Sequence, residues 1–443
     1  MAVRKASASV AMVLALSLAA AGCSSKNKHN GTPGPSGSGG PFAVDTSACP
    51  ASANTALEAG QPIKIGTTGP LSGPLAAVGT GIAAGEQAYF NKVNAEQGGV
   101  DGHQLQLLAK DDGYDPTKTV PAVTGLVNDD KILATLAQIG TANVLASQPL
   151  MEHSCTPQLW VGTGAPQFGD PTHHAWTTLG LTPYSTEATA WADYIAAKKP
   201  GAKVAYLAID NDSGQAYTSS FDAAAQKDGL TVVDKEKHSP TATNVDAQIT
   251  AILASNPDYV IGMTAGGVCV QISAGLAQGG FKGGVIGAAN CGSLTALNAA
   301  GAAADGQLSI GFTGRDPANP ADAGNPDIVQ FKADWAKYGN PQLPAALLSQ
   351  VITGYRFGVM AVATLKAAAA MPGGLTRVDV MNAAWHLNTP LFGVYGGTGA
   401  MNAPTDNYLV EYGVWLKYDA ATKSLVPTGD VVDQEGKSGQ FQG

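Results

Sequence analysis

Positive charge is scarce in this sequence. Asp, Glu, Lys and Arg together make up 13% of its 443 residues, the formal net charge is −9, and no run of Lys and Arg is longer than two residues. Binding to a nucleic acid depends on a basic surface that neutralises phosphate groups. The chain is therefore not expected to bind nucleic acid.

Motifs of familiar catalytic, metal and dinucleotide sites are also missing. Ser72 in GPLSGP (69–74) does not have the GxSxG spacing of a nucleophile elbow. HExxH does not occur, and the adjacent His173 and His174 would point apart on a regular element, which favours a loop over a shared metal ion. GTGIAAG (79–85) departs from the GxGxxG spacing that cradles a dinucleotide. We therefore expect neither an enzyme nor a bound cofactor or metal ion.

The first 22 residues have the features of an export signal. Arg4 and Lys5 precede an apolar stretch, 10–21, that is shorter than the roughly 20 residues of a membrane-spanning helix. The sequence AAGC (20–23) resembles a bacterial lipobox, in which the Cys is diacylated and becomes the mature N-terminus. Residues 1–22 are predicted to be a signal peptide and Cys23 to be lipidated. The alternative is plain secretion with an unmodified Cys23.

A polar segment follows Cys23. Residues 24–45 consist largely of Gly, Ser, Pro and Asn, a composition typical of a flexible linker. We assign residues 23–48 to the lipidated Cys and this linker, which would hold a folded part near the membrane surface.

The other four cysteines are expected to form disulfides. None lies in a CxxC motif, none has a His at metal-ligand spacing, and an exported protein meets an oxidising compartment. Cys269 and Cys291 lie in one predicted strand–helix unit and are the preferred pair. Cys49 and Cys155 then remain for each other.

Apolar segments of strand length recur from Pro62 onward and alternate with helical patterns. Such alternation predicts parallel βαβ units in doubly wound sheets, and the number of units exceeds one sheet. The fold class is therefore expected to be α/β with two parallel-sheet lobes, and 408–419 alternates like an edge hairpin. The predicted strands are 63–66, 105–112, 132–140, 158–162, 203–210, 230–236, 259–264, 284–290 and 308–313.

Six of the predicted strand-to-helix turns are rich in Gly, Ser and Thr. Ligands of open α/β sheets bind outside the carboxyl ends of the strands, where helix N-termini and hydroxyl groups favour a carboxylate. The turns therefore predict a cleft for a small polar solute, unless each Ser or Thr caps only its own helix. They lie at 67–73, 140–144, 162–168, 210–217, 263–267 and 288–293.

Three segments resemble the leucine-binding-protein-like, type I periplasmic-binding family. They are IKIGTTGPLSG (63–73), the segment 85–120 that begins GEQAYFNK, and the segment 156–188 that begins TPQLWVGTGAPQFGDP. The resemblance runs from about Ile63 to Asp433 and implies two α/β lobes, joined by three crossovers, that close around a solute by hinge motion. Lobe 1 is expected to contain 62–181 and 310–392, and lobe 2 to contain 182–309 and 393–433.

The resemblance also implies which residues bind the solute. Gly140 to Asn143 and then Thr163 match turns that contact a carboxylate. Ser213 stands where amino-acid-binding members have an aromatic cover, and Asn290 lies near the position of an acid that pairs with an ammonium. Without that acid a buried ammonium is costly, so a carboxylate or neutral solute is expected. The candidate ligand-binding residues are Leu71, Thr141, Ala142, Asn143, Thr163, Gly164, Ala165, Phe168, Tyr184, Ser213, Gln215, Thr264 and Asn290.

Members of this family are solute-binding proteins of ABC importers, many of them lipoproteins. The resemblance thus implies an exported monomer, lipid-anchored at the outer face of the cytoplasmic membrane. It would deliver a small organic solute (a carboxylate, aromatic acid, amide or amino-acid-like compound) to an ABC permease. The alternatives are a sensory receptor of the same fold and an exported hydrolase.

Replacing Cys23 by Ser is expected to abolish lipid attachment, because its thiol is the proposed acceptor. Metabolic labelling with a palmitate analogue measures this directly. The double variant Cys49→Ser, Cys155→Ser should keep the label. Undiminished labelling of Cys23→Ser would contradict the lipoprotein assignment.

Overall fold

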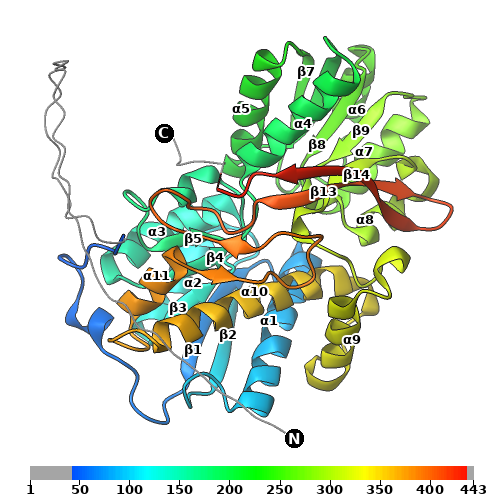
Figure 1. Cartoon of the computed structure of the whole chain (residues 1–443). Coiled ribbons are helices and arrows are strands. Elements are labelled where there is room, and N and C mark those ends of the chain that lie inside the picture. The colour runs from blue at the N-terminus through cyan, green and yellow to red at the C-terminus, as the bar shows by residue number, and fades with distance from the viewer. Residues whose placement is uncertain (1–41, 437–443) are drawn as a thin grey trace, which may run out of the picture. The chain divides into compact units, whose positions relative to one another are not determined.

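A computed structural model of the protein describes residues 42–436 (Figure 1). The predicted signal peptide and the predicted lipidation site, Cys23, lie outside the described residues. Residues 42–436 contain two mainly parallel sheets with helices on both faces, so the predicted α/β fold with two parallel-sheet lobes is confirmed.

The first sheet forms lobe 1 and has five parallel strands in the order β2-β1-β3-β4-β5. Four of these strands were predicted, whereas the three-residue β5 was not. Helix α2 begins at Pro116, because the Asp115 carboxylate accepts the Thr117 N–H at 2.9 Å and Pro suits the first helical position. The elements are β1 (Ile63–Gly69), α1 (Ala76–Gln97), β2 (Leu105–Asp111), α2 (Pro116–Asn128), β3 (Ala134–Leu136), α3 (Thr141–Ser154), β4 (Gln158–Val161) and β5 (Thr177–Leu179).

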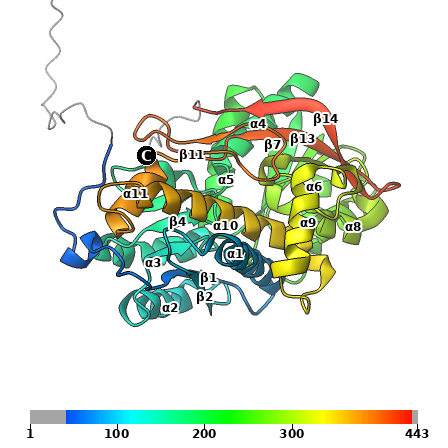
Figure 2. The same cartoon turned by 60° about the horizontal axis from the view of Figure 1, so that its bottom comes forward.

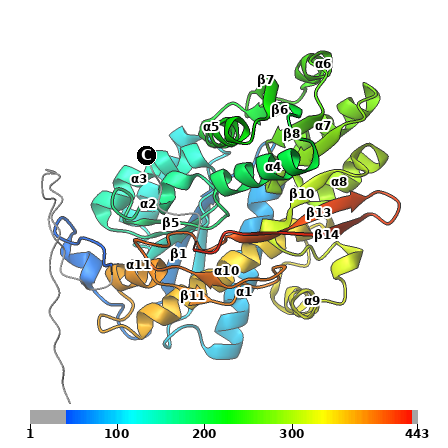
Figure 3. The same cartoon turned by 45° about the horizontal axis from the view of Figure 1, so that its top comes forward.

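The second sheet forms lobe 2 and repeats this arrangement. Its strands run β7-β6-β8-β9-β10 in parallel, and the antiparallel strands β13 and β14 extend it beside β10 (Figure 3). The hairpin predicted at 408–419 therefore belongs to this sheet. The elements are α4 (Tyr184–Lys198), β6 (Lys203–Ile209), α5 (Asp212–Lys227), β7 (Thr231–His238), α6 (Asp246–Ala254), β8 (Tyr259–Met263), α7 (Gly267–Gln278), β9 (Gly284–Gly287), α8 (Leu294–Ala300), β10 (Leu308–Ile310), β13 (Tyr412–Asp419) and β14 (Ser424–Asp433).

The chain passes between the two sheets three times, at 180–183, 311–315 and 410–411, which we call the hinge segments. After the second passage it adds helices to lobe 1. The segment 399–410 had been assigned to lobe 2, but Met401 and Leu409 pack in the core of lobe 1. The remaining elements are α9 (Pro326–Tyr338), α10 (Leu348–Ala369), α11 (Arg377–Trp385), β11 (Asn388–Thr389) and β12 (Gly399–Ala400).

Helices α1 and α10 lie side by side and approach closely (Figure 2). Their contact is made by glycines: a Cβ at Gly85 would lie 1.9 Å from the Val351 carbonyl oxygen, and one at Gly354 would lie 1.9 Å from that of Ile82. By length and composition α10 resembles a membrane span, but it is largely buried, as is typical of a core helix.

Both predicted disulfides are present, Cys49–Cys155 and Cys269–Cys291. The first attaches the segment before β1 to the end of α3. Phe42 and Val44 also pack on the core of lobe 1. Residues 42–48 therefore belong to the folded lobe and not to the expected linker.

Replacing Gly85 by Ala should lower the free energy of unfolding by about 1–3 kcal/mol, because the added methyl group forces α1 away from α10. The matched control is Gly125→Ala in α2, where the nearest atom to a Cβ is 3.8 Å away. That variant should be neutral or more stable, since Ala favours a helix over Gly. Thermal unfolding compares the two, and equal melting temperatures would contradict the close helix contact.

Candidate functional site

A cleft of about 600 Å³ lies between the carboxyl ends of strands from both sheets. From lobe 1 it is lined by Gly140 and Gly162, which follow β3 and β4. From lobe 2 it is lined by Ser213 and Thr264, which follow β6 and β8. In both sheets the strand order reverses direction at this point, and open α/β sheets bind their ligands there.

Four of the thirteen predicted ligand-binding residues line this cleft. They are Tyr184, Ser213, Thr264 and Asn290. All four lie on lobe 2, where Tyr184 begins α4 directly after the first hinge segment. The ring of Tyr184 packs against Gly164, where a Cβ would lie 2.4 Å from Tyr184 Cδ1. Gly164 therefore makes room for the tyrosine, and its predicted ligand contact is replaced by this packing role.

Thr141 and Thr163, two of the predicted hydroxyl donors, lie beneath the cleft wall. Both side chains are buried, and their hydroxyl oxygens are 2.6 Å apart. Thr163 Oγ1 also accepts the Ala165 N–H and lies 3.4 Å from the Tyr184 hydroxyl. Their hydroxyl groups therefore position Tyr184 in this structure.

The other predicted contacts also lie away from the cleft surface. Phe168 is fully buried in the hydrophobic core, and Gln215 faces solvent on α5. Leu71 is half-buried and donates its N–H to Asp111, while Ala142 lies in the first turn of α3. A Ser/Thr/Gly-rich turn marks the end of the sheet at which the cleft lies but does not tell which of its side chains line the cleft.

Asn143 helps to hold the turn that contains Asp112 and Tyr114, which the sequence analysis does not list among the candidate binding turns. Its amide donates to Asp112 Oδ2 at 3.2 Å, and Asp112 Oδ1 accepts the N–H of Tyr114 at 2.9 Å. Tyr114 has a φ of +64°, a left-handed conformation that is strained for a bulky residue. The Asp112 carboxylate and Asn143 together hold this strained turn at the edge of the cleft.

Tyr114 bridges the two sides of the cleft. Its ring lies over Gly140, where a Cβ would be 2.6 Å from Tyr114 Cε2. Burial raises the pKa of Tyr114 to about 12, and hydrogen bonds with Asn211 and Ser213 of lobe 2 partly offset this rise. An aromatic ring from lobe 1 thus lies beside Ser213, which has none of its own. The only sequence signal for this role was the turn sequence DDGYDP (111–116).

Glu187 supplies a buried acid that the sequence analysis missed. Its Oε1 accepts the Ala289 N–H and its Oε2 accepts the Tyr217 hydroxyl, both at 2.6 Å. Burial raises the pKa of Glu187 to about 7. Glu187 does not line the cleft itself, but it bonds to Ala289, the residue before Asn290. The expectation that the cleft offers no acid to an ammonium stays a prediction. In the sequence Glu187 stands out only as the single carboxylate between Asp170 and Asp193.

The wall of lobe 2 is fixed by two further contacts. His238 Nε2 lies 2.7 Å from Thr264 Oγ1, and the Cys269–Cys291 disulfide joins α7 to the turn that carries Asn290. Within residues 42–436, no group of three or more His, Cys, Asp or Glu side chains is arranged to hold a metal ion. The cleft is lined by hydroxyl, amide and backbone groups, by aromatic rings, and by the charged side chains of Arg315, Asp316 and Arg356.

Residues 62–409 match the family described as periplasmic binding protein, and the chain belongs to that family. It is a leucine-binding-protein-like member, as the sequence resemblance predicts. The chain is 27% identical over 199 residues to Leu/Ile/Val-binding protein homolog 3 of Brucella melitensis; this match covers 45% of this chain and about half, 53%, of that relative.

Solved structures share the fold over most of the chain. One is a fatty acid ABC transporter substrate-binding protein from Thermomonospora curvata, with 22% identity, a TM-score of 0.74, and 85% of this chain and 94% of that chain covered. Another is a branched chain amino acid ABC transporter from Thermus thermophilus with bound valine, with 23% identity, a TM-score of 0.74, and 85% and 97% covered.

Glu187 should make the protein less stable as the pH rises from about 5 to 8. Its pKa is raised in the folded state, so the folded protein holds a proton that the unfolded chain releases from about pH 4.5. The cost approaches about 3 kcal/mol above pH 7. Glu187→Gln should lose one hydrogen bond, but its free energy of unfolding should fall less steeply as the pH rises. Unfolding measured at several pH values tests this. The exposed Glu58→Gln is the control, and identical slopes for all three proteins would contradict the assignment.

Proposed function

We propose that this protein is an exported receptor that binds a small organic solute and delivers it to an ABC importer by hinge closure. The observation that carries the proposal is the polar cleft between the carboxyl ends of two sheets that are joined by three hinge segments. Such an arrangement binds a ligand by closing around it and requires no chemical step. Family membership and the ABC transporter proteins among the solved structures support the same role.

The proposed place for the polar head of the solute is the end of β3 and β4. Helix α3 begins at Thr141, directly after Gly140, which has no side chain to cap it. The N–H groups of a first helical turn have no partner within the helix, and the helix dipole adds positive potential there. Gly140, Gly162 and Tyr184 face the cleft at this point. The N–H groups of Gly140 and Gly162 already donate to backbone carbonyls, so the Tyr184 hydroxyl is the donor proposed for a carboxylate or another strong acceptor such as an amide, with the helix dipole adding to the attraction.

The site offers an ammonium group a weaker counter-charge. The two oxygens of Glu187 already accept hydrogen bonds from Tyr217 and Ala289, and a pKa of about 7 leaves much of the group neutral. It therefore offers less than a full counter-charge to a buried cation. We propose a carboxylate, aromatic acid or amide without an ammonium as the preferred solute, in place of leucine, isoleucine or valine.

Closure is proposed to involve Tyr114, which already contacts Asn211 and Ser213 across the cleft. A solute at the strand ends would lie beside this ring and be shielded from water. The closed form would then dock on the permease, with the monomeric receptor held at the membrane by lipidated Cys23.

Tyr184→Phe should weaken binding of a carboxylate solute by about 5- to 10-fold, because it removes one hydroxyl donor and keeps the ring. Calorimetry with matched pairs, each an α-amino acid and its deaminated analogue, tests the solute class in the same experiment. The deaminated member should bind more tightly. Gln215→Ala, which alters a solvent-facing side chain, is the control and should leave the affinity unchanged.

Two outcomes would overturn this proposal. If folded protein binds no member of a panel of carboxylates, amides and amino acids, or if binding causes no decrease in the radius of gyration in solution scattering, the receptor role fails. If the amino acid binds more tightly and Glu187→Gln removes that advantage, Glu187 pairs with an ammonium and only the proposed solute class fails.

A further inference from the structure

A second cavity lies where the three hinge segments meet, and we call it the hinge cavity. It has a volume of about 50 Å³. Leu181 and Thr182 come from the first hinge segment, Phe312 and Thr313 from the second, and Val410 from the third. It is therefore enclosed by the parts of the chain that must change conformation when the lobes close.

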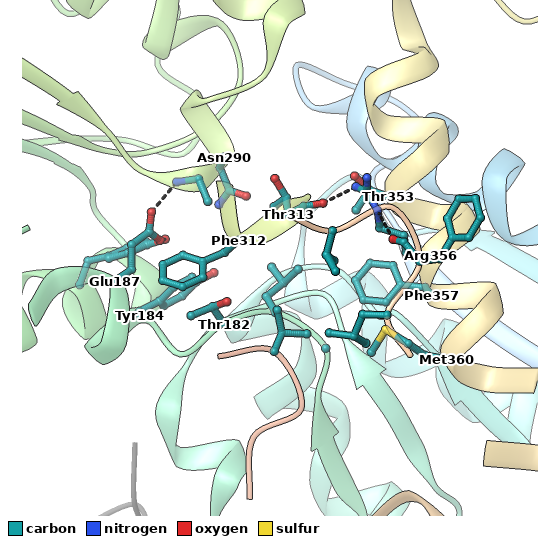
Figure 4. Close-up of a pocket in the computed structure, with 18 residues that line it drawn as sticks. Thr182, Tyr184, Glu187, Asn290, Phe312, Thr313, Thr353, Arg356, Phe357 and Met360 are labelled. Carbon is teal, nitrogen blue, oxygen red and sulfur yellow. Dashed lines mark hydrogen bonds between the residues drawn. The ribbon is translucent and has the colours of Figure 1, made fainter. Parts of the chain in front are cut away.

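The wall of the hinge cavity is mainly apolar. Phe357 and Met360 project into it from α10, at the spacing of one helix face. Phe312 enters from the side of lobe 2, as Figure 4 shows, and Leu391 and Val394 complete the lining. Phe312, Phe357 and Met360 are each at most 4% exposed.

Several polar groups at this wall already make hydrogen bonds. Arg356 donates to the backbone carbonyls of Thr313, Phe392 and Gly393, so its N–H groups are directed at the chain. Glu187 is bonded as described above. Among the described residues that line the hinge cavity, Thr182 Oγ1 is the buried side-chain oxygen without a hydrogen-bond partner, and Thr182 is 6% exposed.

The hinge cavity is continuous with the cleft. Leu181, Tyr184, Asn290, Thr313 and Phe357 line both spaces. Tyr184 therefore lies between the proposed site of the polar head and the apolar wall. A solute bound at Tyr184 has the apolar space directly behind it.

We infer that the solute is amphipathic and that its short aliphatic end enters the hinge cavity. The inference rests on the proposed function and names the class of solute. An apolar cavity of about 150 Å³ holds a benzene ring, whereas one water-sized unit needs about 10–15 Å³. The hinge cavity therefore takes an aliphatic end of about three to five carbon atoms and excludes a ring.

The negative head is directed away from the hinge cavity. Glu187, which lines that cavity, repels a carboxylate when it is ionised. Arg356 lines the same cavity, but its N–H groups are directed at the backbone carbonyls of Thr313, Phe392 and Gly393, whereas the N-terminus of α3 attracts a carboxylate. The carboxylate head of the solute is thus placed at the N-terminus of α3, and its aliphatic end is placed in the hinge cavity. Because the apolar end touches all three hinge segments, the length of the solute also affects how the lobes close.

The test measures the affinities of straight-chain monocarboxylates from two to ten carbon atoms, and of the corresponding primary amides, by calorimetry. The dissociation constant should fall about fourfold for each methylene that enters the cavity, and then level off. Met360→Ala should move this plateau to chains about two or three carbon atoms longer. Benzoate should bind no more tightly than a carboxylate of two or three carbon atoms.

Thr182→Val is the second variant, because it keeps the shape of the side chain and removes the unpartnered hydroxyl. It should bind the longer chains about two- to fivefold more tightly and leave acetate unchanged. Val431→Ala, on the exposed face of β14, is the control. All variants are compared after their melting temperatures confirm that they are folded.

The outcomes separate this inference from the proposed function. If acetate binds and longer chains gain nothing, or if the gain is the same in Met360→Ala and Thr182→Val as in the unaltered protein, the apolar end lies elsewhere and the inference is wrong. If neither these compounds nor any member of the earlier panel binds, the receptor role itself is wrong.

Discussion

The buried guanidinium of Arg356 holds together the chain segments between the lobes. It donates to the carbonyl oxygens of Phe392 and Gly393, each at 3.0 Å, and to that of Thr313. Carbonyl groups in irregular buried segments need such donors, because the helices and strands do not satisfy them. Burial lowers the pKa of Arg356 to about 10, and Asp316 partly offsets this fall, so the group stays charged at neutral pH. The cleft and the hinge cavity are both arranged around this cation.

A second feature of the site is that several polar residues predicted to bind the solute are buried beneath the residues that line the cleft. Thr141 and Thr163 bond to each other under Tyr184, and Asn143 bonds to Asp112 under Tyr114. The rings of Tyr114 and Tyr184, which face the cleft, are thereby fixed in position by buried hydrogen bonds. This arrangement keeps the two rings rigid, which limits the entropy lost when a solute binds.

The sequence was sufficient for most of the fold. The alternation of apolar strands and helices located nine of the ten parallel strands, and β5 was missed because its three residues form no pattern of their own. The disulfide pairs followed from the spacing of four cysteines and were found as predicted. The boundaries were less accurate: residues 42–48 and 399–410 are polar or irregular in sequence, yet they pack on lobe 1 through a few buried side chains.

The sequence by itself determined the fold class and the end of each sheet at which the cleft lies, because periodicity and turn composition are local properties. Tertiary structure alone decided which side chains reach the cleft. Glu187 and Ala289 are 102 residues apart, and Tyr114 meets Asn211 from the other lobe. Contacts over such separations leave no local pattern, since each residue is ordinary for its own helix or turn. The hinge cavity is the clearest case, because its wall combines segments from 180 to 410 that only the folded chain brings together.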